Sequence, residues 1–314
     1  MSDNNASSSS PATIAQLIAG MGLFGTSTPL SKIIGENLPV FTASCLRMAI
    51  ACVVLAPFVW FATERFAKVQ RSDVKVILAI SAFGMVGFTA TMLFGMRLTT
   101  GVIGSTIMSA SPAVTAVGAV VFLGAAMNWR KAGALGLAVV GVVVINVWRG
   151  DQGGGEALVL GAALVAAAVC MEAAYTLLSR KLSDGITSLE ATLAASFLAA
   201  VLFVALAFVF DDAPFALGSA DSFTLGALLF WGVMTGGLAP VLWYNGARKA
   251  PGALTAGAMA VMPLTALVTS YLLLGEAFRW VHLAGFGLVF AGLLLMILEH
   301  ASGGGSSDAE AQGA

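Results

Sequence analysis

Long apolar stretches with few charges follow one another along almost the whole chain. A helix needs about 20 mainly apolar residues to cross the hydrocarbon core of a bilayer. Runs of suitable length occupy residues 13–34, 38–62, 74–97, 101–123, 131–148, 157–179, 187–210, 222–247, 252–274 and 280–298. Because backbone groups in lipid must be hydrogen-bonded within their own segment, we expect each run to be a helix. The pattern therefore predicts an all-α integral membrane protein with ten transmembrane helices.

The ends of the chain and a short stretch near its middle lack this pattern. Residues 1–12 and 299–314 are rich in Ser, Gly and polar side chains, which predicts disordered tails. The Gly-rich residues 150–156 predict a linker, with one five-helix repeat at 13–149 and a second at 157–298.

An internal repeat supports this division. A shift of 151 residues aligns 95–141 with 246–292 and gives thirteen identities without a gap, whereas the helices before residue 95 match weakly and need an insertion. The matched positions include Arg97 and Arg248, Pro112 and Pro263, and Trp129 and Trp280. Because five is an odd number of crossings, the second repeat is inverted. Inverted repeats place a substrate site near the bilayer midplane between the halves, so we expect a central cavity.

Basic residues predict the orientation, because Lys and Arg in short loops stay on the cytoplasmic side. With the N-terminus inside, the inner loops hold ten of them and the outer ends four. The ten are Arg65, Lys68, Arg71, Lys75, Arg130, Lys131, Arg180, Lys181, Arg248 and Lys249. Both termini are therefore expected in the cytoplasm of a bacterial-type inner (plasma) membrane.

Composition and motifs exclude several other classes. Only 10% of the 314 residues are charged and 59% are hydrophobic, whereas a soluble domain has about 25% charged residues. The net charge of -1 argues against nucleic-acid binding. The chain has no P-loop, and His282 and His300 lack the spacing of metal ligands. We expect no cofactor, no metal and no enzymatic activity, and a monomer that contains a complete pathway.

The Pro-centred helices that end in Leu-Gly carry a resemblance to a known family. They run from Ser111-Pro112-Ala113 to Leu123-Gly124-Ala125 and from Met262-Pro263-Leu264 to Leu274-Gly275-Glu276. Over about residues 13–298 the chain resembles the drug/metabolite transporter superfamily in its EamA-type ten-helix branch, and within it the YddG-type amino-acid exporters. The family has an acid after Leu-Gly in both halves; Glu276 fits this pattern and Ala125 departs from it, while Arg47 fits. The resemblance implies export of amino acids or related metabolites.

Prolines inside the predicted helices are candidate hinges. Proline removes a backbone donor and frees the carbonyl one turn earlier, which in a membrane is tolerated beside neighbouring helices or a wet cavity. The candidates are Pro29, Pro112, Pro240 and Pro263. Static kinks are the alternative.

Charges within the predicted helices are candidate ligands for the substrate, because they are costly in lipid. Glu172 could bind an ammonium group or a proton, and Arg47 could bind a carboxylate; structural hydrogen bonds are the alternative for both. Lys32 and Arg97 lie near helix ends, from which long basic side chains can snorkel towards water. Glu190 and Glu276 are expected at the membrane interface.

Polar and aromatic residues in the helices complete the set of candidate cavity residues. They are Thr26, Thr28, Thr89, Ser105, Met108, Ser109, Tyr175, Trp243, Tyr244 and Asn245. Aromatic walls with a few hydroxyl groups suit a small amphipathic ligand. Ser and Thr also serve helix packing, and Trp243 and Tyr244 could instead anchor the inner interface.

These observations favour a secondary transporter that exports amino acids, with aromatic and other hydrophobic ones as candidates, by alternating access. Export of drugs or other small metabolites is the first alternative, and a non-transporting membrane scaffold or receptor is the second. Sugar-phosphate exchange is disfavoured because the core offers few cations.

Overall fold

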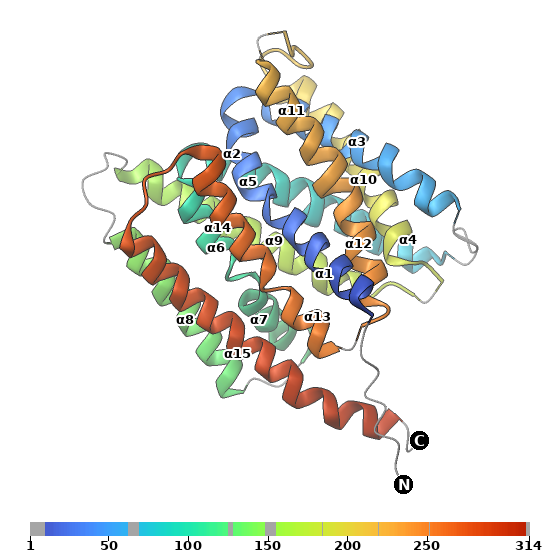
Figure 1. Ribbon diagram of the computed structural model, residues 1–314. Helices are drawn as coiled ribbons and strands as arrows, with labels where there is room; N and C mark the ends of the chain where they lie inside the picture. Colours follow the sequence, from blue (N-terminus) through green and yellow to red (C-terminus); the bar gives the residue numbers. More distant parts are fainter. Residues whose placement is uncertain are drawn as a thin grey trace.

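The computed structural model describes residues 10–61, 69–124, 128–147, 155–183, 185–218, 220–250 and 252–311. Within these ranges the regular elements are all helices, and they form ten segments (Figure 1). Seven segments are individually long and apolar enough to cross a membrane, and three shorter apolar helices, Ala132–Gly141, Val261–Leu274 and Trp280–Leu295, complete the set. The predicted all-α membrane fold is confirmed.

The five segments of the first half include two that are interrupted and one that changes its helix type. They are α1 and α2 (Pro11–Gly25, Ser27–Asn37), α3 (Val40–Trp60), α4, η1 and α5 (Arg71–Ala79, Ile80–Gly87, Phe88–Leu98), α6 and α7 (Gly101–Met108, Ser111–Leu123), and α8 (Trp129–Val147). The element η1 is a π-helix. The wider turn of a π-helix often marks a functional site.

The second half repeats this plan, except that its first segment is one continuous helix. Its segments are α9 (Gly155–Ser179), α10 (Ser188–Phe210), α11, η2 and α12 (Ser222–Phe230, Trp231–Leu238, Ala239–Ala247), α13 and α14 (Gly252–Ala258, Val261–Leu274), and α15 (Trp280–Ala311). Most of the predicted linker at 150–156 lies outside the described residues. At one end of the bundle α1 begins and α15 finishes, and we call it the terminal end. The opposite end of the bundle is called the far end.

Two helix boundaries differ from the expected tails. The first helix begins at Pro11, where Ser10 accepts a hydrogen bond of 3.3 Å from the backbone N–H of Thr13. The last helix continues to Ala311 through residues that were expected in a tail. No proline follows Glu299 to end it.

The repeat extends further back than the sequence indicated. The same shift of 151 residues carries α4 onto α11 and η1 onto η2 without an insertion, because 71–79 becomes 222–230 and 80–87 becomes 231–238. The prediction that helices before residue 95 need an insertion is therefore wrong for this segment. Apolar side chains can exchange for one another in lipid while the backbone geometry persists, so sequence identity is lost first.

The halves are interleaved and pack through matching helices. In this arrangement α3 lies against α10, α8 against α15, and α6 against α14, while α1 lies against α12 and α5 against α9 (Figure 1). Each of these pairs joins one half to the other. The space between the halves therefore runs along the centre of the bundle.

The four candidate hinge prolines each follow an irregular stretch of helix. Pro29 follows the break between α1 and α2, Pro112 the break between α6 and α7, and Pro263 the break between α13 and α14. Pro240 follows η2 by two residues. Since proline cannot donate to the carbonyl one turn earlier, the ladder is interrupted at these positions.

Candidate substrate cavity

A cavity of about 380 Å³ lies at the centre of the bundle, where the interrupted helices of both halves meet. It reaches towards the terminal end along Ser179, Thr192 and Tyr244. On the far side the lining stops near Arg47, which is seven residues from the first residue of α3, Val40. At 1.5 Å per residue, about 10 Å of packed helix closes the far end.

Arg47 projects from α3 to the cavity and is held by groups of both halves. Its Nη1 donates a hydrogen bond of 3.3 Å to Thr89 Oγ1, and its Cζ lies 4.2 Å from the ring centroid of Trp231. Trp231 is fixed in turn, since its Nε1 donates to Ser27 Oγ at 2.7 Å. Arg47 Nε has no hydrogen-bond partner in the described part of the chain. The guanidinium is thus oriented by an aromatic ring and keeps a donor for a ligand.

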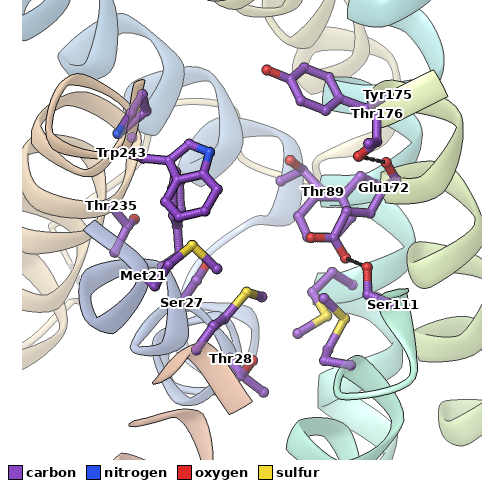
Figure 2. Close-up of a pocket in the computed structure, with 18 of the residues that line it drawn as sticks. Met21, Ser27, Thr28, Thr89, Ser111, Glu172, Tyr175, Thr176, Thr235 and Trp243 are labelled. Carbon is purple, nitrogen blue, oxygen red and sulfur yellow. Dashed lines mark hydrogen bonds between the residues drawn. The ribbon is translucent and has the colours of Figure 1, made fainter. Parts of the chain in front are cut away.

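Glu172 on α9 provides the carboxylate of the cavity. Its Oε2 accepts a hydrogen bond of 2.7 Å from Ser111 Oγ, at the start of α7. One turn further along α9, Thr176 donates to the Glu172 carbonyl at 3.1 Å. Figure 2 shows Glu172 and Ser111 across the cavity from Ser27 and Thr28. The carboxylate lies beside the break between α6 and α7, so a movement of this break would displace it.

A pair of tyrosines lies where the cavity approaches the terminal end. The hydroxyl groups of Tyr175 on α9 and Tyr244 on α12 are 2.9 Å apart, and Tyr175 also lies 3.4 Å from Thr192 Oγ1 on α10. Three helices of the second half are therefore linked by hydroxyl groups at this point.

Methionines form a large part of the apolar lining. The cavity is lined by Met21, Met48, Met85, Met92, Met108, Met259 and Met262. Unbranched thioether side chains adapt to ligands of different shape and make favourable contacts with aromatic rings. Such a lining accommodates apolar groups without requiring one fixed outline.

Comparison with family models matches this chain twice to the EamA-like transporter family, at residues 12–147 and 159–298. The chain belongs to the EamA-like transporter family. This agrees with the expected membership of the drug/metabolite transporter superfamily and makes the protein a transporter rather than an enzyme. Each matched range contains one five-helix half.

Related proteins cover nearly the whole chain. An uncharacterized transporter of Bacillus subtilis, YetK, is 30% identical over 292 residues, which are 90% of this chain and 86% of that protein. A probable terminal-alkyne amino-acid exporter of Streptantibioticus cattleyicolor is 23% identical over 284 residues, with 89% and 91% covered. A solved crystal structure with 18% sequence identity superposes with a TM-score of 0.63 over 93% of this chain and 99% of that one. At this identity the superposition shows a shared fold.

Most of the candidate residues of this EamA-like transporter lie together around the cavity. The lining includes Thr28, Arg47, Thr89, Met108, Ser109, Glu172, Tyr175, Trp243, Tyr244, Pro112, Pro240 and Pro263. Figure 2 shows Trp243 on the side of the cavity opposite Tyr175.

Four candidates lie outside the lining. The Thr26 hydroxyl bonds to the Leu23 carbonyl at 2.7 Å, within its own helix. Ser105 is buried and lies 2.9 Å from Ser270 across the contact between α6 and α14, which is a packing role. Asn245 on α12 and Pro29 on α2 are also not among the lining residues.

The charged residues near the helix ends bond to backbone groups, while Arg97 remains exposed. Lys32 and Arg97 bond to backbone carbonyls of neighbouring helices. Glu190 is buried and forms a capping box with Thr187, whose hydroxyl donates to Glu190 at 2.9 Å. Glu276 accepts hydrogen bonds from the backbone of Gly101 and Val102. The backbone N–H and C=O groups at helix ends lack partners within their helix, and these four side chains supply such partners.

Sequence reasoning missed Trp231 and most of the methionines. Apolar residues are present on every face of these helices, so neither type is conspicuous. One signal was available for the methionines, since thirteen occur in 314 residues.

Proposed function

We propose that this protein exports amino acids with apolar side chains across the inner membrane by secondary, alternating-access transport. The observation that carries the proposal is that Arg47 and Glu172 are the charged residues among the described lining of a methionine-rich cavity. One cation and one carboxylate complement a zwitterion. The amino-acid exporter of Streptantibioticus cattleyicolor supports this substrate class.

In this proposal Arg47 binds the substrate carboxylate and Glu172 binds its ammonium group. The methionines contact the side chain of the substrate, and a cavity of about 380 Å³ is suited to one small molecule. The two halves rock about the cavity, with the breaks beside Pro29, Pro112 and Pro263 as hinges, because interrupted helices deform at low cost. One chain contains both halves, so we propose a monomer.

Export of other apolar compounds is the second candidate. The methionine lining favours it, since adaptable surfaces accept many shapes. It would make Arg47 and Glu172 dispensable for transport.

Flux into proteoliposomes that contain the purified protein tests these candidates. Saturable uptake of labelled Phe, Leu or Met, with weak uptake of Asp and Ser, is the expected result. The methyl ester of the same amino acid lacks the carboxylate and should be transported independently of Arg47. Imposed pH gradients and membrane potentials then show which ion, if any, is coupled.

Matched variants test the roles of the two charged cavity residues in transport. Arg47→Gln and Glu172→Gln should each abolish most of the amino-acid flux, whereas Glu156→Gln, at an exposed position on the same helix as Glu172, should leave it unchanged. Flux of drugs but not of amino acids would replace the proposal with the second candidate. Absence of any flux from folded protein would favour the scaffold hypothesis.

A further inference from the structure

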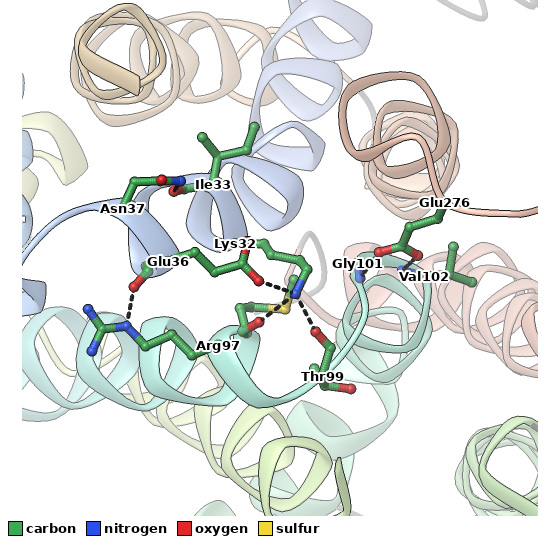
Figure 3. A network of polar contacts seen from close by, with 11 residues as sticks. Lys32, Ile33, Glu36, Asn37, Arg97, Thr99, Gly101, Val102 and Glu276 are labelled. Carbon is green, nitrogen blue, oxygen red and sulfur yellow. Dashed lines mark hydrogen bonds and ion pairs between the residues drawn. The ribbon is translucent and has the colours of Figure 1, made fainter. Parts of the chain in front are cut away.

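At the far end, two basic residues each bind the helix on which the other one lies. Lys32 on α2 donates to the carbonyls of Met96 at 3.2 Å and Thr99 at 2.8 Å, where α5 ends, and pairs with Glu36 at 2.7 Å. Arg97 on α5 donates to the carbonyl of Gly35, near the end of α2 (Figure 3). It also donates to the carbonyl of Leu38, directly after α2, at 2.8 Å. The last carbonyls of a helix lack intrahelical partners and carry partial negative charge, which favours such contacts.

A carboxylate from the other half joins this group. Glu276 follows α14 and accepts hydrogen bonds from the backbone N–H groups of Gly101 and, at 2.9 Å, of Val102, at the first turn of α6 (Figure 3). A carboxylate at a helix N-terminus satisfies free donors and meets the positive end of the dipole. This contact spans the two halves. Glu276 also attracts Lys32 electrostatically.

The internal repeat does not preserve the acidic residue of this group in the other half. By the shift of 151 residues, Ala125 matches Glu276 and Arg248 matches Arg97. Alanine has no carboxylate, and Arg248 is exposed. A different contact joins the halves at the terminal end, where the Ser183 hydroxyl donates to the carboxylate of Asp73 on α4 at 2.7 Å.

The position of the cavity agrees with this asymmetry. Its lining extends to Ser179 and Tyr244 near the terminal end, whereas towards the far end it stops at Arg47 and Met108. The end that carries the three charged side chains is the closed one.

We propose that Lys32, Arg97 and Glu276 form a latch that closes the far end and makes the state accessible from the terminal end the resting state of this transporter. Opening the far end separates α2 from α5 and residue 276 from α6, which breaks these contacts. The residue that matches Glu276 in the other half, Ala125, has no carboxylate with which to form the same contact. The bias between the two states is thus a property of the chain without substrate. The inference rests on the alternating access of the proposed function, but its readout requires no substrate.

Thiol accessibility from each side of the membrane tests the latch. Cys45, Cys52 and Cys170 are replaced by Ala, and Met108→Cys places one thiol on the cavity wall next to the latch. A membrane-impermeant maleimide is then applied to intact cells and to inverted vesicles. With the latch intact, labelling should be fast from the side of the terminal end and slow from the far side.

Glu276→Ala removes both acceptor oxygens and should raise the far-side labelling rate by about tenfold, a coupling of about 1.4 kcal/mol. Lys32→Met keeps an apolar stem, leaves the cap on α6 in place and should act in the same direction. Asp212→Ala is the matched control, because this exposed carboxylate lies at the same end outside the latch. Size-exclusion profiles verify folding.

Unchanged far-side labelling in both folded variants would overturn the proposal. An equal rise from both sides would overturn it as well, since the network would then hold the fold and not one gate. The latch stands if labelling shifts while amino-acid flux is absent, and in that case only the proposed substrate fails.

Discussion

At the scale of single residues, the guanidinium of Arg47 connects the two halves at the cavity. Its planar face lies over Trp231 of the second half, and its Nη1 bonds to Thr89 of the first. Arginine stacks on aromatic rings and presents several donors in a fixed plane, properties that the ammonium group of lysine lacks. The geometry therefore requires arginine in particular, and not only a positive charge.

Arg47→Lys is expected to raise KM for the transported amino acid by about tenfold, with a smaller change in the maximal rate. Lysine keeps the charge but loses the stack on Trp231 and the paired donors, and hydrogen bonds to charged groups contribute about 1.5–3 kcal/mol. Initial-rate flux measurements give both parameters. An unchanged KM would show that a point charge is enough at this position.

At this scale the sequence identified the charged and aromatic cavity residues and missed the apolar ones. Arg47 and Glu172 are conspicuous because charges in lipid are costly. Trp231 and Met262 were not, since an apolar side chain on a membrane helix faces lipid or protein with equal ease. Ser105 lies outside the lining for a related reason, as a hydroxyl serves packing between helices as well as it serves a cavity.

At the scale of helices, close contacts through glycine hold the interrupted segments together. Gly25, the last residue of α1, lies against α14, where an added Cβ would meet the Met262 carbonyl and lie 2.8 Å from Thr265 Cβ. The contact joins the break between α1 and α2 to α14, the helix that contains Pro263. A larger residue would separate them.

Gly25→Ala should destabilise the protein by about 1–3 kcal/mol through overpacking. Gly287→Ala on α15 is the matched control, because it is exposed and an added Cβ there meets nothing within 4 Å. That control should be neutral or stabilising, since alanine favours a helix interior by about 0.5–1 kcal/mol over glycine. Thermal unfolding in detergent compares the two. Equal effects would mean that Gly25 is not tightly enclosed.

The helices themselves were predictable, and their irregular parts only in part. Apolar length fixes where a segment crosses, and Pro112 and Pro263 indicated two of the breaks. The π-helices η1 and η2 were not foreseen, because one residue of extra winding over eight residues hardly changes the apolar pattern.

At the scale of the whole molecule, ten crossings return the chain to the side on which it began. The inner loops are expected to hold ten basic residues against four at the outer ends. Trp60 and Trp129 at terminal-end helix ends and Trp280 at a far-end one are exposed, as interfacial anchors are.

Fusions of a fluorescent protein that folds only in the cytoplasm should be bright at both the N- and the C-terminus. A phosphatase active only outside the cytoplasm should be inactive at both termini and active when inserted after Asp212. The opposite pattern would place both termini outside the cytoplasm. One bright and one dark terminus would contradict an even number of crossings.

The repeat was visible in the sequence, but the difference between the far end and the terminal end of the bundle was visible only in part. The mismatch of Ala125 with Glu276 can be read directly, whereas the reciprocal contacts of Lys32 and Arg97 depend on α2 and α5 lying side by side. That neighbourhood arises only after the chain has folded.

The identical offset of the two π-helices bears on the origin of the protein. Both η1 and η2 occupy eight residues, and they are separated by the 151 residues that separate the repeats. Two independent insertions at the same register would be a coincidence, so the widened turn was already present in a single five-helix ancestor before its gene was duplicated. That ancestor had to pair with an upside-down copy of itself, which means that it entered the membrane in both orientations.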